Sequence, residues 1–244
     1  MSILPSVRAV LGERFIVNFR MKPDALKKYL QSVAPIDWLR PQEINGWAIA
    51  SYCLLDLHNL TVAPLPAVAG LHSLSCAPRY AVIDTSGADE KPAVFLTERF
   101  TNSSFGAWFT GLGFSAPHPL VQAVIEHDGH TTALRVHQTG DAREELFAAN
   151  VQATDQCTST VWQTTQEFVD FIAQGVSSYG MSRHAGRLTK LDLHKTDASY
   201  EPLEVLSLSG SVVAEWQACG ATFDSAFRTQ GGRYEWAYHG LTDL

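Results

Sequence analysis

The sequence has little charge and no long apolar run. Only 18% of its 244 residues are charged, and 18 basic against 25 acidic residues give a net charge of −7. A nucleic-acid binder needs a basic patch to neutralise phosphates, so we expect no nucleic acid as a partner. No apolar run approaches the ~18 residues that cross a bilayer, and residues 1–15 contain no hydrophobic signal segment. We therefore expect no membrane association and predict a cytoplasmic location.

Common chemical motifs are absent as well. The four cysteines are widely scattered without a C-x-x-C pair, which predicts reduced, buried thiols. Neither a phosphate-binding G-x-x-x-x-G-K-[ST] loop nor a G-x-S-x-G serine elbow occurs. His127 and His130 flank a turn, and His184 and His194 lie ten residues apart, but no third ligand stands at metal-site spacing. We expect neither a metal nor a cofactor.

What the sequence does contain is many strand patterns and a few helices. The apolar fraction of 45% and the length suit one domain over residues 1–244 with a sizeable core. We interpret residues 15–19, 47–57, 79–85, 93–100, 188–194, 203–214 and 233–238 as strands, and residues 60–78 as a long surface connection rich in proline. This order indicates an α+β fold with two or three helices.

Two helices have clear local signals. Pro23 begins an apolar stripe with helical spacing that ends before Pro35. Thr164 and Glu167 have the spacing of a capping box, and Gly175 is placed to end the helix that follows.

A β-hairpin has the strongest signal. Two apolar runs, residues 120–127 and 130–137, flank Asp128-Gly129, a pair preferred in two-residue turns. In that register six side chains share the core face: Val121, Ala123, Ile125, Thr132, Leu134 and Val136.

Charged residues inside apolar strands are the candidate functional residues. Glu98 and Arg99 interrupt the predicted strand 93–100, and Arg79 stands next to Tyr80 at the start of another. A charge on a core face must be paired or must line a wet pocket. Two interpretations stay open, namely an ion pair at the rim and a polar cluster that recognises an anionic or carbonyl-bearing ligand. Lys190, between Leu188 and Leu191, is a further candidate for an inward-facing functional group.

The order of these segments resembles an uncharacterised branch of the acetoacetate decarboxylase-like superfamily, over roughly residues 14–238. The resemblance rests on the segments F-I-V-N-F-R with P-D-A-L, N-G-W-A-I, R-Y-A-V, K-P-A-V-F-L, the Asp128-Gly129 hairpin, the helix that leads to Tyr179, and G-R-L through D-L-H. It implies a single α+β domain around a closed, cone-like antiparallel β-barrel with an internal cavity. The resemblance also implies that the family's decarboxylation uses a Schiff-base lysine activated by a neighbouring lysine. Residues 95–116 contain no lysine, so we do not expect Schiff-base decarboxylation in this chain.

Three hypotheses about function follow. The first is a protein that binds a small organic ligand, such as a carboxylate or carbonyl compound, through Arg79, Tyr80 and Arg99, without Schiff-base decarboxylase activity. The second is a lyase or related enzyme that acts on a small keto or enol acid by general acid–base catalysis, with Glu98 and Lys190 as catalytic residues and Arg79 in support. The third is a structural or interaction module, and the sequence leaves a homodimer open.

Overall fold

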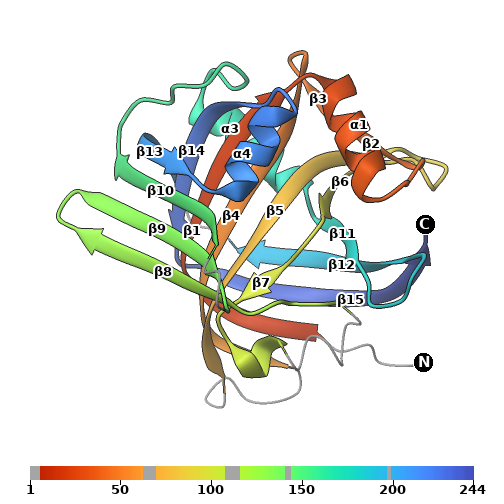
Figure 1. Cartoon of the computed structure of the whole chain (residues 1–244), viewed down its shortest axis with the longest axis horizontal. Helices are drawn as coiled ribbons and strands as arrows, with labels where there is room; N and C mark the ends of the chain where they lie inside the picture. The colour runs from red at the N-terminus through yellow and green to blue at the C-terminus, as the bar shows by residue number, and fades with distance from the viewer. Residues whose placement is uncertain (1–5, 63–69, 108–115, 141–143, 197–198) are drawn as a thin grey trace.

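The computed structural model describes residues 6–62, 70–107, 116–140, 144–196 and 199–244 (Figure 1). The strands are β1 (Ser6–Met21), β2 (Leu39–Pro41), β3 (Glu43–Ile44), β4 (Trp47–Val62), β5 (Leu71–Asp84), β6 (Lys91–Leu96), β7 (Phe100–Thr101), β8 (Val121–Asp128), β9 (Thr131–Gln138), β10 (Glu145–Ala153), β11 (Ser177–Met181), β12 (Arg187–Thr196), β13 (Tyr200–Ser209), β14 (Thr222–Gln230) and β15 (Arg233–Asp243). The helices with defined bounds are α1 (Pro23–Val33), α3 (Thr165–Gln174) and α4 (Ser211–Ala218).

Within the described ranges, all fifteen strands belong to one sheet, which confirms a mostly-strand α+β fold. Successive ladders lead from β4 through β5, β6, β11, β12 and β15 to β1, and β1 pairs with β4 again. The ladder between β6 and β11 is parallel, and the other ladders of this path are antiparallel. Seven strands are therefore hydrogen-bonded in a circuit that returns to its starting strand.

The long strands β1 and β4 are buried on both faces. Phe15, Val17 and Phe19 alternate onto one face, where they join Tyr52 and Leu54 in the largest apolar cluster. This cluster also takes in side chains of α1 and α4, the two helices that lie together over one end of the sheet in Figure 1. We call it the packed face. The opposite face of the two strands, which we call the cavity face, carries Arg14, Ile16 and Cys53.

The local helix signals are confirmed. α1 begins at Pro23 and buries the side chains of Leu26, Tyr29 and Leu30. The Thr164 hydroxyl accepts a hydrogen bond from the Glu167 amide at 3.2 Å, and α3 follows.

The β8–β9 hairpin is also confirmed, with a shift of its turn. Asp128 pairs with Thr131, so the two turn residues are Gly129 and His130, and Gly129 has a positive φ of 59°. Each cross-strand pair consequently moves by two residues from the expected register. Because side chains alternate with a period of two, the expected face is unchanged. Five of its six side chains are buried and Ile125 is half-buried.

Three predicted segments need correction. The predicted surface connection 60–78 is wrong where it can be judged, because residues 60–62 belong to β4 and residues 71–78 form the first half of β5, paired with β4, while residues 63–69 lie outside the described residues. Pro78 stands in the gap between the parts of β5 that pair with β7 and β6, the kind of interruption at which a strand tolerates proline. The predicted strand 93–100 ends at Leu96, so Glu98 and Arg99 lie in the link to β7. The run 203–214 ends as a strand at Ser209 and continues as α4.

Candidate functional site

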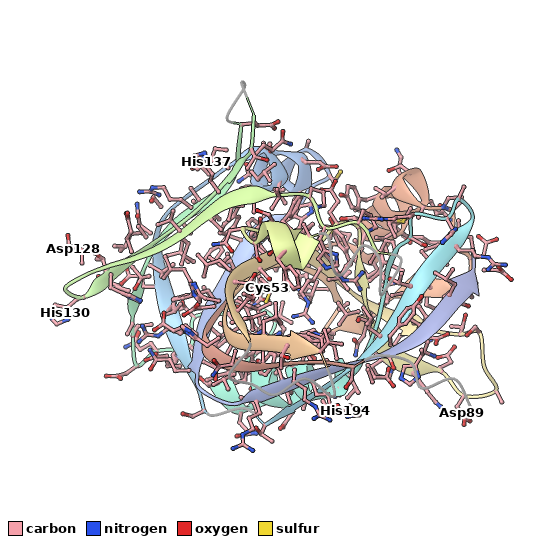
Figure 2. All side chains as sticks on the ribbon, turned by 90° about the horizontal axis from the view of Figure 1, so that it is seen from below. Cys53, Asp89, Asp128, His130, His137 and His194 are labelled. Atoms are coloured by element: carbon pink, nitrogen blue, oxygen red, sulfur yellow. The ribbon has the colours of Figure 1, made fainter. Side chains whose placement is uncertain are left out.

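A cavity of about 260 Å³ lies inside the circuit of seven strands. Each of the seven contributes a side chain to its wall: Arg14 from β1, Cys53 from β4, Arg79 from β5, Leu96 from β6, Ser178 from β11, Leu191 from β12 and Tyr234 from β15. Figure 2, which views the molecule from below, shows Cys53 near the centre of the ring of strands. The volume is just below the ~300 Å³ at which typical small-molecule sites begin, so it suits a small ligand.

The charged groups of this cavity are all basic among the described residues. Arg14, Arg79, Arg99 and His118 line it, whereas no Asp or Glu of the described chain does. Much of the remaining wall is apolar, with leucines from β4, β6 and β12. Buried charge is costly without a partner of opposite sign, so this cavity favours an anion.

Arg14 is fixed in place by its neighbours. Its Nη1 donates to the hydroxyls of Tyr200 and Tyr234, both at 3.2 Å, and its Nε donates to the Cys53 Sγ at 3.4 Å. Burial disfavours its charge, but the interactions with Tyr234, Tyr200 and Cys53 outweigh burial and raise the pKa of Arg14. Arg14 therefore remains a fixed positive charge in the wall.

Arg79 and Arg99 have more capacity left for a ligand. Burial and the charge of Arg79 lower the pKa of Arg99 to about 10, and burial and the charge of Arg14 lower the pKa of Arg79. Arg99 Nη1 donates to the Thr189 hydroxyl at 3.3 Å, while its buried Nη2 has no hydrogen-bond partner in the described structure. A bound anion would reduce the repulsion between the Arg79 and Arg99 charges, and it would accept the hydrogen bond that Arg99 Nη2 lacks.

A glycine makes room for the Arg99 guanidinium. A Cβ atom at Gly180 would lie 2.2 Å from Arg99 Nη1 and 2.7 Å from Arg99 Cζ. Any side chain at this position of β11 would force the guanidinium to move. Gly180 thus determines where the positive charge of Arg99 lies.

Two cysteines of the cavity wall have opposite electrostatic environments. Burial alone would raise the pKa of the Cys53 thiol, but the positive charges of Arg14 and Arg79 outweigh it, and the pKa is lowered. Cys76 accepts a hydrogen bond from the Tyr52 hydroxyl at 3.3 Å, and burial raises its pKa to about 12. Cys53 therefore has the more stable thiolate.

His118 is the remaining titratable group in the wall. Its Nδ1 lies 3.1 Å from the backbone oxygen of Ala116. Burial and the charge of Arg99 lower the pKa of His118 to about 4, which keeps the imidazole neutral at pH 7.

Comparisons with known proteins identify the fold. No protein-family model matches the sequence, and no curated protein matches it either. Solved structures do match. An acetoacetate decarboxylase of Legionella pneumophila superposes with a TM-score of 0.66 at 11% identity, covering 97% of this chain and 86% of that one. The chain has the acetoacetate decarboxylase-like fold.

Two further structures agree over nearly full length. An acetoacetate decarboxylase-like enzyme from Sphingomonas wittichii has a TM-score of 0.63 at 12% identity, covering 100% of this chain and 94% of that chain. The enduracididine biosynthesis enzyme MppR, in complex with the condensation product of pyruvate and imidazole 4-carboxaldehyde, has a TM-score of 0.61 at 11% identity, covering 100% and 90%. The predicted resemblance is thus confirmed in the fold.

The structure brings two of the predicted ligand-binding residues into one place. Arg79 and Arg99 both line the cavity. Tyr80 does not, because alternation along β5 turns it to the packed face, where its hydroxyl donates to Tyr29 at 3.0 Å and accepts from Trp216 Nε1 at 2.9 Å.

The two predicted catalytic residues lie outside the cavity. Glu98 is exposed, and burial of part of its side chain together with the Glu215 carboxylate raises its pKa. Lys190 lies in a separate groove with Asp84 and Asp192, and its Nζ is 5.2 Å from the centre of the Tyr179 ring. The reason is again alternation, since the neighbouring Leu191 of β12 points into the cavity.

Sequence reasoning missed Arg14, Cys53 and His118. Arg14 carried a usable signal, because it directly precedes the apolar run F-I-V-N-F, as Arg79 precedes Y-A-V. Cys53 and His118 carried none, since their roles depend on strands that are distant in sequence.

Proposed function

We propose that this protein binds a small organic anion, of the carboxylate or oxo-acid class, in the arginine-lined cavity, and that it forms no Schiff base there. The observation that carries the proposal is the unbalanced positive charge of Arg14, Arg79 and Arg99. The described wall contains no carboxylate to neutralise it, so a ligand carboxylate would supply the missing charge and a partner for Arg99 Nη2.

The architecture supports a small enclosed ligand. We propose that the circuit of seven strands acts as the closed, cone-like barrel that the resemblance implies. The neighbours in structure support the ligand class, since MppR is seen with pyruvate and with a pyruvate condensation product, and the Legionella protein is an acetoacetate decarboxylase.

The positions of the lysines support the absence of a Schiff base. The chain has six lysines, and all lie in described segments: Lys22, Lys27, Lys28, Lys91, Lys190 and Lys195. None of them lines the cavity. Amine catalysis needs a lysine in contact with the bound carbonyl compound. An acid–base enzyme that uses Glu98 and Lys190 has no support from their positions either.

Thermal unfolding with added ligand tests the proposal. We expect pyruvate and acetoacetate to raise the midpoint, with about 2.7 kcal/mol of stabilisation at 100 times Kd. The neutral analogue pyruvamide should have no effect. Arg99→Met and Arg79→Met should lose at least tenfold in affinity, and Arg8→Met, an exposed arginine of the same strand as Arg14, should bind as the parent does. Equal stabilisation by pyruvamide, or unchanged binding by both cavity variants, would refute the proposal.

Borohydride trapping tests the second part of the proposal, namely that no Schiff base forms. After incubation with pyruvate and reduction, we expect the intact mass to stay unchanged. A reduced adduct on any lysine would show that a Schiff base forms.

The compartment is a separate proposal. All four cysteines are free thiols. We propose a cytoplasmic location because a reducing compartment keeps such thiols unpaired. Fractionation of cells that express a tagged chain tests it.

No helix in the described residues has the length and apolar character needed to cross a membrane.

A further inference from the structure

Two histidines and an aspartate meet on the outer side of the β4–β5 pair. Asp56 Oδ2 lies 3.0 Å from His58 Nε2, and Asp56 Oδ1 lies 2.6 Å from His72 Nε2. The three ligand atoms of Asp56, His58 and His72 all lie within 4.8 Å of one another. We propose that this trio binds a divalent first-row transition-metal ion such as Zn²⁺.

The strand geometry explains why these residues meet. Asp56 and His58 are two residues apart on β4, and so they project from the same side. The register of β4 with β5 shifts between Leu57 and Leu60, where Asn59 has a positive φ of 53°. The bulge thus lies next to His58, on the side of β4 that pairs with β5, the strand that carries His72. The imidazole rings of His58 and His72 stack, with centroids 4.8 Å apart and 28° between their planes.

The donor set matches transition-metal chemistry. Two imidazole nitrogens and one carboxylate oxygen are ligands for Zn²⁺ and its neighbours, at ~2.0–2.2 Å from the metal. Such bonds require ligand atoms roughly 3 to 3.5 Å apart. Asp56 contacts each histidine through a different carboxylate oxygen, at 3.0 and 2.6 Å, so binding of one metal ion would require the half-exposed imidazoles to rotate toward a shared position.

The site is open on one side and narrow on the other. The side chains of His58 and His72 are 49% and 55% exposed, while that of Asp56 is 20% exposed. On the strand β1 side, a Cβ atom at Gly12 would lie 2.5 Å from Asp56 Oδ2 and 2.8 Å from His58 Nε2. The absence of a side chain at Gly12 thus leaves room for these two ligands. Water or an exogenous ligand could complete the coordination from the exposed side.

This arrangement differs from the other histidine–carboxylate pairs of the described chain. His127 Nε2 lies 3.1 Å from Glu13 Oε2 and is 49% exposed, as His58 is, but no second imidazole belongs to a comparable trio there. His127 is therefore the matched control for a histidine that contacts a carboxylate without forming a metal site.

Isothermal titration of the full chain with ZnCl₂, after treatment with EDTA, tests the proposal. We expect one tight equivalent per chain, and at least tenfold weaker binding for His58→Ala, His72→Ala and Asp56→Asn. His127→Ala should bind as the parent does. Co²⁺ should give visible absorption bands that the three ligand variants lose.

A positioning variant adds a test that keeps all three ligands. Gly12→Ala should weaken Zn²⁺ binding because its methyl group displaces Asp56 and His58. Unchanged Zn²⁺ affinity in the three ligand variants, or an equal loss in His127→Ala, would overturn the proposal. Circular dichroism should show that each variant is folded, as expected for changes at partly exposed side chains.

Discussion

The two faces of the β1–β4 pair are both buried, but their contents differ. On the packed face, Tyr52 stacks on Phe147 at 4.1 Å between ring centroids, and Phe19 meets Trp216 edge-on at 5.0 Å. On the cavity face, the same two strands border a cavity of about 260 Å³ and place Arg14 and Cys53 in its wall. Alternation along a strand assigns neighbouring residues to these two environments. The packed face is thus filled by aromatic contacts, whereas the cavity face carries buried positive charge.

The largest expected effect comes from neighbouring leucines on β4. Leu54 is 1% exposed on the packed face, whereas Leu55 lines the cavity. We expect Leu54→Ala to cost about 4 kcal/mol of unfolding free energy, because it removes apolar contacts and opens a new void. Leu55→Ala should cost about 1 kcal/mol, since it enlarges a void that already exists.

Urea unfolding of the two variants measures the difference. Ligand binding provides the second readout, because Leu54→Ala should leave the affinity for pyruvate intact as long as the chain is folded. Equal losses of stability in the two variants would show that the two faces are packed alike.

The same alternation explains which features of the fold and site could be predicted from the sequence. The hairpin, the first helix and the capping box depend on neighbours within a few residues, and their positions follow from local chemistry. Arg79 could be recognised as a charge at the start of an apolar strand. Its neighbour Tyr80 shares that signal but faces Tyr29 and Trp216 on the packed face. The face that each residue takes depends on pairing with β4 and β6, which the sequence does not display.

The candidate site was harder to predict than the fold for the same reason. Its wall takes one or more residues from each of seven strands, and Arg14 contacts Tyr200 and Tyr234 across 186 and 220 residues of sequence. The sequence prediction placed Glu98 and Arg99 in a regular strand over residues 93–100, in which neighbouring side chains would point to opposite faces. That strand ends at Leu96, and therefore the argument from alternation did not apply to either residue.

A smaller effect is expected on the stability of the folded chain at acidic pH. The pKa of His118 lies near 4 in the folded chain and near 6.5 in an unfolded one, because burial and Arg99 disfavour its charge. Between these values the unfolded chain binds a proton that the folded chain does not. The contribution of the neutral His118 to the free energy of unfolding is therefore fully present above pH 6.5. It is lost as the pH falls toward 4, by up to roughly 3 kcal/mol.

His118→Gln tests this contribution. The variant should lose less stability than the parent between pH 6.5 and 4, as measured by urea unfolding at several pH values. A saturating carboxylate should also reduce the loss in the parent, since a bound anion beside Arg99 favours the charged imidazole. Parallel pH profiles for the two proteins would place His118 outside the charged part of the cavity.

The smallest effect expected is a difference in thiol reactivity between the two cysteines of the cavity wall, of which only Cys76 also joins the packed cluster. Cys53 lies between Arg14 and Arg79, which lower its pKa, whereas Cys76 belongs to the packed cluster and has a pKa near 12. Thiolates, rather than thiols, are alkylated. Iodoacetate at neutral pH should therefore modify Cys53 at least tenfold faster than Cys76, because each unit by which the Cys53 pKa lies below that of Cys76 raises its relative thiolate population tenfold.

Two reagents separate the effect of the arginine charges from the effect of access to the thiols. Iodoacetate is an anion and should gain from the arginines, whereas neutral iodoacetamide should discriminate less between the two cysteines. Pyruvate should slow the reaction of Cys53 with both reagents, because the proposed ligand occupies the same cavity. Peptide mapping by mass spectrometry measures each rate. If Cys76 reacts first, or if pyruvate protects neither thiol, the arginines do not set the chemistry of this face, and its basic character would be a feature of packing alone.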